Sequence, residues 1–288
     1  MNLQQKLASG EFVILAEMEP PKGVDVSAMV ANASRVKNRV DAFVVPEMSN
    51  AVMRMSSLGG CMVLQSKGLE TVLQVCCRDR NRLALQADLL AAHALGIANI
   101  MAVAGEDPSF GDHHRTRAVY DVDLLELLDG IQKLQTGRDM AGIELKGVPQ
   151  FYVGSTVNTG ASGGVVDLEL EQLDKKLTAG AQFFITPPVF DLQSLARFNK
   201  RLGERACCVI PTVMLLKSAG MASYIDRHMD NVHVPSDLIR RIQKAPDKAR
   251  ECVQIAREMV SGLRDAGYHG VLIATIGWED KLPNILEG

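Results

Sequence analysis

The segment FVILAEMEPPK, from Phe12 to Lys22, most constrains what this chain can fold into. Its apolar residues can form a buried strand, and Pro20 and Pro21 stop that strand because proline has no N–H to donate to a central ladder. Glu17 and Glu19 lie at the downstream end of the same run. Because carboxylates are costly to bury, two of them at the end of a buried strand point to a functional site.

Short apolar runs recur along the whole chain, and helical segments follow most of them. Strands that alternate with helices predict a parallel sheet, and eight such units favour an α/β fold of the (β/α)8 TIM barrel type. An open doubly wound sheet is disfavoured because no GxGxxG turn follows the first strand. The predicted strands are Phe12–Glu19, Ala42–Val45, Glu70–Cys76, Asn99–Ala104, Gln150–Val157, Phe183–Thr186, Cys207–Thr212 and Gly270–Thr275.

Apolar periodicity and capping residues place the helices between these strands. At 288 residues, with no linker or low-complexity segment, the chain is predicted to be one barrel domain covering residues 1–288. The predicted helices are Leu3–Leu7, one capped by Asp25 and reaching Asn38, Val52–Gln65, one capped by Asp79 and ended by Gly96, Val122–Leu134, Asp167–Ala179, one starting at Asp191, Ser218–Met229, and two opening at Ser236 and Pro246.

The composition excludes several classes of function. The formal charge is -3, with 31 basic residues scattered among 34 acidic ones, so no nucleic-acid-binding stripe is present. No apolar run approaches the length of a membrane span and no signal-peptide pattern opens the chain, so we expect a soluble cytoplasmic protein. The six cysteines form no CxxC and no group with zinc spacing, which favours buried reduced thiols and no metal site.

In a barrel of this type the catalytic side chains come from the downstream ends of the strands. Glu17 and Glu19 share one face of their strand, so one or both should point into the barrel mouth. A carboxyl group in that partly apolar place has a raised pKa, as a general acid near neutral pH requires. The alternative is that these glutamates form structural ion pairs with Arg78 or Arg80.

A long polar loop from Gly105 to Asp121 follows the fourth strand, and long ordered loops in compact domains are usually functional. Glu106 and Asp107 begin this loop; they are either functional acids or a polar turn or helix cap. His113 and His114 are expected at a solvated edge and not at a metal. Without a GxSxG elbow or a P-loop, the residues themselves indicate a barrel enzyme with a carboxylate at its first strand.

EMEPP, from Glu17 to Pro21, and six further segments in the same order along the chain resemble the methylenetetrahydrofolate reductase family. The six segments are LQVCCRDRNRLALQADLL from Leu73, AGEDPSFGDH from Ala104, VYDVDLLELL from Val119, LTAGAQFFITPPVFD from Leu177, IPTVMLLKSAGMASYI from Ile210 and IGWEDKLPNI from Ile276. Within them, RDRN and LKSAGM are most similar to the short reductases of anaerobic bacteria and archaea that work with an iron-sulfur partner subunit.

The resemblance implies a flavin held at the downstream face of a barrel. It implies hydride transfer from reduced flavin to 5,10-methylenetetrahydrofolate, which gives 5-methyltetrahydrofolate. Aligned on the prolines, Glu17 matches the family's general acid, and Glu106 matches an acidic residue near flavin and folate. The matched flavin-contacting positions are Gln74, Gly105, Tyr120, Asp123 and Lys176.

The sixth strand carries the matched substrate-binding positions Thr186 and Pro187. Many relatives have a glutamine where Pro187 stands, and relatives that bind FAD often have an arginine where Ala104 stands. The resemblance therefore implies a flavin that is either FAD or FMN, a tetrahydrofolate substrate, an iron-sulfur partner as electron donor, and an oligomer. The alternative function is a diverged folate- or flavin-binding subunit of a larger redox or methyl-transfer complex.

Overall fold

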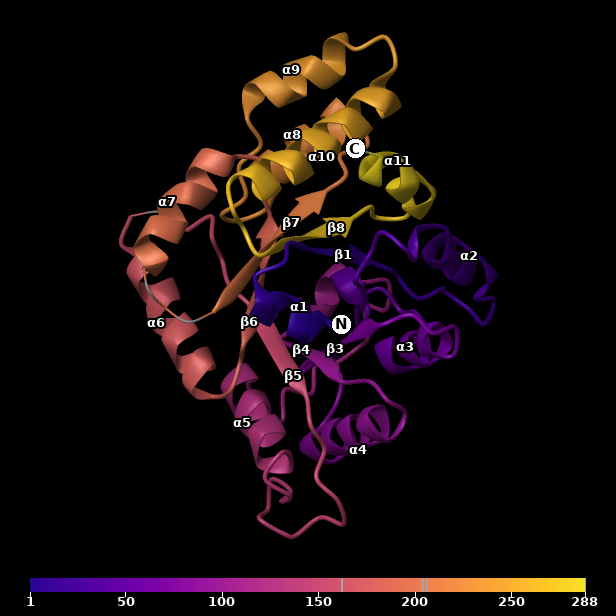
Figure 1. Cartoon of the computed structure of the whole chain (residues 1–288), viewed down its shortest axis with the longest axis vertical. Coiled ribbons are helices and arrows are strands. Elements are labelled where there is room, and N and C mark those ends of the chain that lie inside the picture. Colours follow the sequence, from indigo (N-terminus) through magenta and orange to yellow (C-terminus); the bar gives the residue numbers. More distant parts are fainter. Residues whose placement is uncertain (162, 204, 206, 288) are drawn as a thin grey trace.

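The computed structural model describes residues 1–161, 163–203, 205 and 207–287. In this part of the chain, eight parallel strands pair in sequence order and close into a barrel, β1-β2-β3-β4-β5-β6-β7-β8, which confirms the predicted TIM-barrel fold (Figure 1). The strands are β1 Val13–Glu17, β2 Ala42–Val45, β3 Thr71–Cys76, β4 Asn99–Val103, β5 Tyr152–Thr156, β6 Phe183–Pro188, β7 Cys208–Met214 and β8 Gly270–Ala274.

Helices follow the strands and cover the outside of the barrel. The α-helices are α1 Leu3–Ser9, α2 Ser27–Val36, α3 Ser57–Gln65, α4 Arg82–Ala94, α5 Leu124–Leu134, α6 Val165–Thr178, α7 Leu192–Leu202, α8 Ala219–His228, α9 Ser236–Lys244, α10 Lys248–Asp265 and α11 Leu282–Leu286. Short 3-10 helices lie in three loops: η1 Ser49–Ala51, η2 Pro108–Phe110 and η3 Glu279–Lys281. No helix among the described residues has the length and apolar character needed to cross a bilayer.

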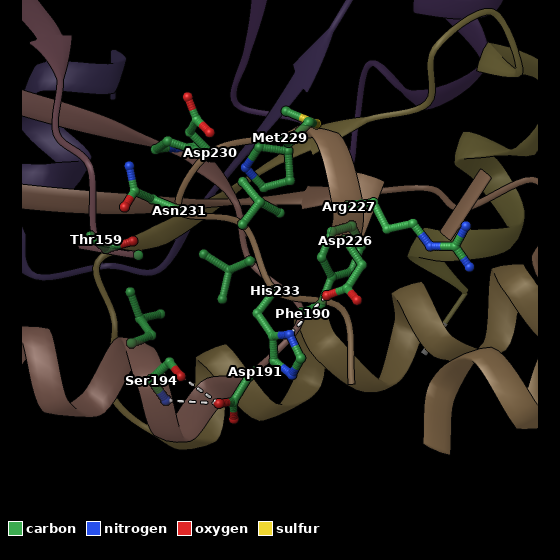
Figure 2. A pocket seen from close by; sticks show the side chains of 16 residues that line it. Thr159, Phe190, Asp191, Ser194, Asp226, Arg227, Met229, Asp230, Asn231 and His233 are labelled. Carbon is green, nitrogen blue, oxygen red and sulfur yellow. Dashed lines mark hydrogen bonds and ion pairs between the residues drawn. The ribbon is translucent and has the colours of Figure 1, made fainter. Parts of the chain in front are cut away.

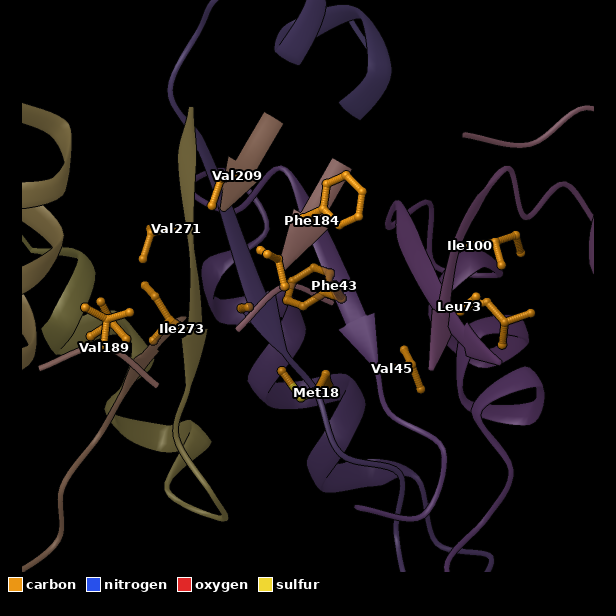
Figure 3. Close-up of a cluster of buried hydrophobic side chains, with 14 of the residues drawn as sticks. Met18, Phe43, Val45, Leu73, Ile100, Phe184, Val189, Val209, Val271 and Ile273 are labelled. Carbon is orange, nitrogen blue, oxygen red and sulfur yellow. The ribbon is translucent and has the colours of Figure 1, made fainter. Parts of the chain in front are cut away.

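The alternation of side chains along each strand divides the core into two layers. The outer layer lies between the barrel and its helices and includes Phe43, Phe184 and Ile273 (Figure 3). The inner layer fills the barrel with residues such as Leu15 and Phe183. Removing a fully buried ring such as that of Phe184 costs roughly 3–5 kcal/mol, so the barrel wall depends on these contacts.

The inner layer is packed without room for further atoms at its centre. The rings of Tyr152 and Phe183 stack with centroids 5.0 Å apart. A Cβ on Gly154 would lie 2.3 Å from the Phe183 ring, so only glycine fits at this point of β5. The barrel interior is therefore a filled core below its mouth, as in other barrels of this class.

Helix α1 closes the amino-terminal end of the barrel. Leu3 and Leu7 belong to the inner core layer, and Figure 1 shows α1 lying across the centre of the ring of strands. The Leu3 backbone N–H donates to Glu70 at 2.9 Å, and Lys6 forms an ion pair with Asp41 at 2.5 Å. These contacts hold α1 over the ends of β2 and β3, so the opposite, carboxyl-terminal end is the open one.

Two predicted local features are wrong, and long-range contacts explain both. Asp79 does not cap α4, because its carboxylate pairs with Arg78 at 2.8 Å and Asn81 caps the helix instead. Residues 52–56 are not helical, and α3 begins at Ser57. Backbone N–H groups of that segment donate to other loops, with Met53 bonded to Asp112 and Met55 to Pro21.

Candidate functional site

Glu17 points into the mouth of the barrel. Val13 and Leu15 belong to the inner core layer and Ala16 to the outer one, so the alternation along β1 directs Glu17 inward. The strand ends at this residue, shortly before the two prolines. In the described part of the chain no hydrogen bond or ion pair reaches the partly buried Glu17 carboxyl. It is therefore available to a bound molecule.

The surroundings of Glu17 favour its protonated form. Burial raises the pKa of Glu17 to about 7, and the carboxylates of Glu19, Glu279 and Glu106 add to the rise. A carboxyl group with this pKa holds a proton near neutral pH and can still release it, which is what a general acid must do. The predicted raised pKa at the end of the first strand is confirmed for this residue.

Glu19 lies in a different environment, although it is only two residues away. Its carboxylate forms an ion pair with Arg54 at 2.8 Å, and Arg54 also donates to the Pro20 carbonyl oxygen at 3.3 Å. Burial raises the pKa of Glu19, while Arg54 opposes the rise. We call the group formed by Glu17, Glu19, Arg54 and Glu279 the acidic corner.

The expected alternative partners of these glutamates, Arg78 and Arg80, are wrong. Arg78 bonds Asp79 at 2.8 Å and Glu106 at 3.4 Å. Arg80 bonds Glu47 at 3.3 Å. The sequence could not identify Arg54 as the partner of Glu19. Arg54 lies in the segment before α3, which was predicted to be helical.

Gln74 lies on the inward face of β3, level with the mouth. Its side-chain oxygen accepts a hydrogen bond from the Glu47 backbone N–H at 2.7 Å. Glu47 itself is buried, and its carboxylate accepts from the Ser57 backbone N–H at 2.9 Å and from Arg80. These bonds fix the Gln74 amide so that its nitrogen, which donates to no group in the described residues, faces away from Glu47.

The end of β4 brings Gly105, Glu106 and Tyr120 together. Gly105 has a φ of +94°, and a Cβ there would lie 2.3 Å from the Cys76 sulfur. The Tyr120 hydroxyl donates to the Gly105 carbonyl oxygen at 3.3 Å. The guanidinium of Arg78, buried beneath, fixes Glu106 through its carboxylate and through its carbonyl oxygen at 3.3 Å. Glycine is required here by both the backbone angle and the close approach.

Asp107 and Asp123 start helices. Asp107 caps η2 by accepting from the Ser109 backbone N–H at 2.8 Å, which agrees with the expected cap or turn. Asp123 caps α5 in the same way through Glu126 at 2.8 Å. Both carboxylates are therefore used in local structure, and Asp123 lies at the start of a helix and not on the inward face of a strand.

Lys176 is a buried cation at the end of β5. Its ammonium group donates to the Thr156 carbonyl oxygen at 2.7 Å, and burial lowers its pKa although Glu169 opposes this. No ion pair neutralises Lys176 within the described ranges. An ammonium group has three donors, so a phosphate or hydroxyl group could still bind here.

Thr186 and Pro187 form, with Pro188 and Thr212, what we call the proline corner, where β6 bulges against β7. The Thr186 hydroxyl accepts from the Thr212 backbone N–H at 3.1 Å and donates to the Pro187 carbonyl oxygen at 2.6 Å. The Thr212 hydroxyl donates to the Thr186 carbonyl oxygen at 2.6 Å. Both hydroxyls are thus occupied, so Thr186 is a poor ligand as it stands.

A cavity of about 430 Å³ adjoins the proline corner and is lined by Pro187 and Pro188 (Figure 2). Its polar side includes Asp226, which accepts from His233 at 2.8 Å, and Asn231. The sequence analysis did not single out this hollow, because its walls come from three loops that are distant in the chain. It lies apart from Glu17, which is not among its lining residues.

Loops around the other half of the mouth are tied to one another. Asp112, from the loop after β4, forms an ion pair with Lys22 and accepts from the Met53 backbone N–H at 3.0 Å. The Lys22 and His113 side chains hold the pKa of Asp112 well below its usual range. Three loops, after β1, β2 and β4, therefore meet at one carboxylate and form a fixed rim.

The groups left available at the mouth fit the expected flavin. Among the described contacts the Gln74 amide nitrogen has no acceptor, so it could donate to a ring carbonyl, whereas the space that a side chain on Gly105 would fill is taken by Cys76. Lys176 is a buried cation that a phosphate would neutralise. Gln74 and Lys176 could hold the group, and Glu17 at the same end of the barrel has a pKa raised to about 7.

Comparisons with known proteins agree with this geometry. The chain is 22% identical over 304 residues to methylenetetrahydrofolate reductase 2 of Schizosaccharomyces pombe, covering 100% of this chain and 47% of that protein. It therefore spans about half the length of this curated relative.

Two solved structures share the fold at low identity. One is a protein from Clostridium thermocellum that binds two copies of 5-methyl-5,6,7,8-tetrahydrofolic acid, with a TM-score of 0.68, 12% identity and coverage of 99% of this chain and 96% of the other. The second is EDTA monooxygenase from Chelativorans sp. BNC1, with a TM-score of 0.55, 10% identity and coverage of 96% and 92%. The family model of methylenetetrahydrofolate reductase matches residues 2–288, so the chain belongs to the methylenetetrahydrofolate reductase family.

Proposed function

We propose that this chain reduces 5,10-methylenetetrahydrofolate to 5-methyltetrahydrofolate at the barrel mouth. The observation that carries the proposal is Glu17, an inward-facing carboxyl with a pKa raised to about 7 and no partner in the described contacts. Family membership and the folate-binding neighbour of the same fold support a folate derivative as substrate.

Glu17 acts as the general acid in this proposal. Its proton goes to the amine nitrogen that leaves the methylene carbon, so the five-membered ring opens and an iminium remains on the other nitrogen. A bound flavin supplies the hydride that this carbon accepts. The proton on Glu17 must then be replaced from solvent through the open end of the barrel.

The other matched residues bind and orient. Gln74 and Gly105 would contact the flavin ring, Tyr120 would cover it from the β4 loop, and Lys176 would meet a phosphate or ribityl hydroxyl. Asp123 would contact the flavin from the start of α5. Glu106, held by Arg78, keeps a negative charge near the mouth that contributes to the raised pKa of Glu17.

The electron donor we propose is an iron-sulfur partner subunit, because the RDRN and LKSAGM segments resemble the short reductases that use one. The flavin is either FAD or FMN, since Ala104 stands where a phosphate-gripping arginine is common among FAD-binding relatives. A cytoplasmic location and an oligomeric state stay predictions.

A second candidate, a folate- or flavin-binding subunit without independent activity, is favoured by the proline corner. Pro187 offers no side-chain donor, and the neighbouring Thr186 hydroxyl is already bonded. Substrate held by fewer hydrogen bonds at β6 would bind weakly, which a subunit dependent on a partner could tolerate.

One experiment separates the two candidates. The protein is purified without oxygen, the absorption spectrum and mass of the released cofactor are recorded, and turnover of methylenetetrahydrofolate is measured with a reduced viologen dye. Bound flavin with dye-driven turnover by the isolated chain supports the reductase. Bound flavin without turnover supports the binding subunit, and a chain that cannot be reconstituted with FAD or FMN contradicts both.

A further inference from the structure

The charged neighbours of Glu17 are all of the same sign as its own ionised form. They come from three elements: Glu19 from its own segment, Glu279 from the β8 loop and Glu106 from the β4 loop. Each disfavours a second negative charge at Glu17. The proton on Glu17 is therefore held by burial and repulsion, with no cation beside it.

Glu19 has the opposite arrangement. The Arg54 guanidinium lies 2.8 Å from its carboxylate, and both Arg54 and Lys217 lower its pKa against the effect of burial. Glu279 repels Glu19 as it repels Glu17, so this shared neighbour does not favour either site for the proton. Two things therefore distinguish the glutamates: Glu17 is the more deeply buried, and Glu19 alone has a cation paired with it in the described residues.

Arg54 is held firmly in this position. Besides the bond from Arg54 to Pro20, the next residue, Met55, donates its backbone N–H to the Pro21 carbonyl oxygen at 3.0 Å. The Arg54 side chain is only 26% exposed and forms one wall of a hollow of about 200 Å³, together with Glu279. The loop that carries Arg54 is therefore fastened to the turn that follows Glu19.

Lys217 and Glu279 are engaged elsewhere. Lys217 donates to the Ile276 carbonyl oxygen and lies 5.5 Å from the centre of the Trp278 ring. The Glu279 carboxylate accepts from the Gly277 backbone N–H at 2.9 Å. Among the described contacts, Arg54 is thus the cation that bonds Glu19 directly.

From this asymmetry we infer that Arg54 is a positioning residue: it keeps Glu19 ionised, so that Glu17, which faces the barrel mouth, is the carboxyl that holds a proton. Two close carboxyls share a proton according to their environments. The inference deepens the proposed function and rests on it for its catalytic consequence. Its physical content, the place of the proton, can be measured without turnover.

Infrared spectroscopy of protein labelled with 13C-glutamate tests this inference directly. In wild-type protein near neutral pH, the band of a protonated glutamate should disappear in Glu17→Gln and persist in Glu19→Gln. In Arg54→Gln, Glu19 should hold part of the proton, so adding Glu19→Gln to this variant should remove part of the band. Loss of the adjacent cation should move the proton ratio between the two sites by at least about tenfold.

Matched variants control for damage to the fold. Arg54→Lys keeps the cation and should retain the wild-type band, whereas Arg54→Gln keeps a donor for Pro20 without the charge. In a Glu19→Gln background, Arg54→Gln should leave the Glu17 band unchanged, because the competing carboxyl is gone. If Arg54→Gln does not fold, Arg54→Met, which keeps the length of the side chain without its charge, takes its place, and part of its protonated band should likewise be lost on adding Glu19→Gln.

A Glu17 band with the same size and pH dependence in wild type and folded Arg54→Gln overturns the inference. So does a protonated Glu19 in wild-type protein. If the proposed reductase activity holds, Arg54→Gln should also lower kcat by roughly tenfold with KM unchanged, in line with the loss of protonated acid. Absence of folate turnover in wild type would defeat the proposed function and leave the infrared result to stand alone.

Discussion

The acidic corner and the proline corner lie at the same end of the barrel but use their polar groups in opposite ways. In the proline corner the hydroxyls of Thr186 and Thr212 bond neighbouring backbone groups. In the acidic corner Glu17 has no partner among the described contacts, and its pKa is raised to about 7. Saturated polar groups stabilise a fold, whereas an unsatisfied one is available for chemistry at a cost in stability.

Under the proposed function, this contrast favours chemistry near β1 and a role in shape for the β6 end. The contrast also bears on a departure from related sequences, the proline at position 187. Pro187 can change how tightly a substrate binds, but it cannot remove the proton donor, because that donor is on the other side of the mouth. The predictions below test this division, beginning with the largest effect.

Replacing Glu17 by glutamine should abolish most folate reduction. Loss of a general acid typically costs about 10²–10⁴-fold in rate, while reduction of the bound flavin by its donor should be unaffected. Stopped-flow measurement of the two half-reactions checks this. Glu11→Gln, at an exposed position just before β1, is the matched control and should behave as wild type. Equal folate turnover in Glu17→Gln would remove this residue from the acid role.

The same substitution should change how stability depends on pH. The pKa of Glu17 rises on folding from 4.5 to about 7, so the folded state binds the proton more tightly and stability falls as pH rises between these values. The loss should total about 3 kcal/mol by about pH 8. Glu17→Gln should lack this part of the slope in urea unfolding followed across pH. A parallel slope in the variant would show that the carboxyl is not desolvated.

Pro187→Gln should sharpen the contrast from the other side. A glutamine adds a donor and an acceptor beside the cavity at β6, so KM for methylenetetrahydrofolate should fall by up to about tenfold, with kcat nearly unchanged. Steady-state kinetics with a reduced dye measures both constants. A large change in kcat would mean that the proline corner takes part in the chemistry after all.

Thr212→Val should give the smallest effect. It removes the hydroxyl that bonds the Thr186 carbonyl oxygen and should lower the free energy of unfolding by about 1 kcal/mol. Thr178→Val removes a similar bond to Asp174 at the exposed end of α6 and should change stability by less than about 0.5 kcal/mol. Equal losses in the two variants would show that the hydrogen bonds at the bulge stabilise the fold no more than an exposed one does.

Local pattern was sufficient for the parts of the molecule that local physics determines. The run AFVV predicted β2 as Ala42–Val45 without error, Asp191 caps α7 as expected, and the period of two along β1 predicted that one or both of Glu17 and Glu19 face inward. Each of these depends on neighbours within a few residues. The barrel followed from repetition of such units.

Pairings between distant residues could not be predicted in the same way. Asp79 is a good helix cap by composition, but Arg78 competes for its carboxylate, and Asn81 takes the cap. The partner of Glu19 is Arg54, separated from it by a whole βα unit. The cavity beside Pro187 is likewise formed by loops that meet only in the folded barrel. The sequence predicted a carboxyl at the barrel mouth, and the fold was needed to identify the charged groups around it.

Helix α1 has a consequence for traffic through the molecule. With Leu3 and Leu7 packed into the inner core layer, α1 covers the amino-terminal end of the barrel. In the proposed reaction the hydride donor, the folate and the water that restores the proton would then all use the carboxyl-terminal end of the barrel. Two reactants that enter by the same opening compete for the same space. This architecture would therefore favour two successive half-reactions over simultaneous binding of the electron donor and the folate.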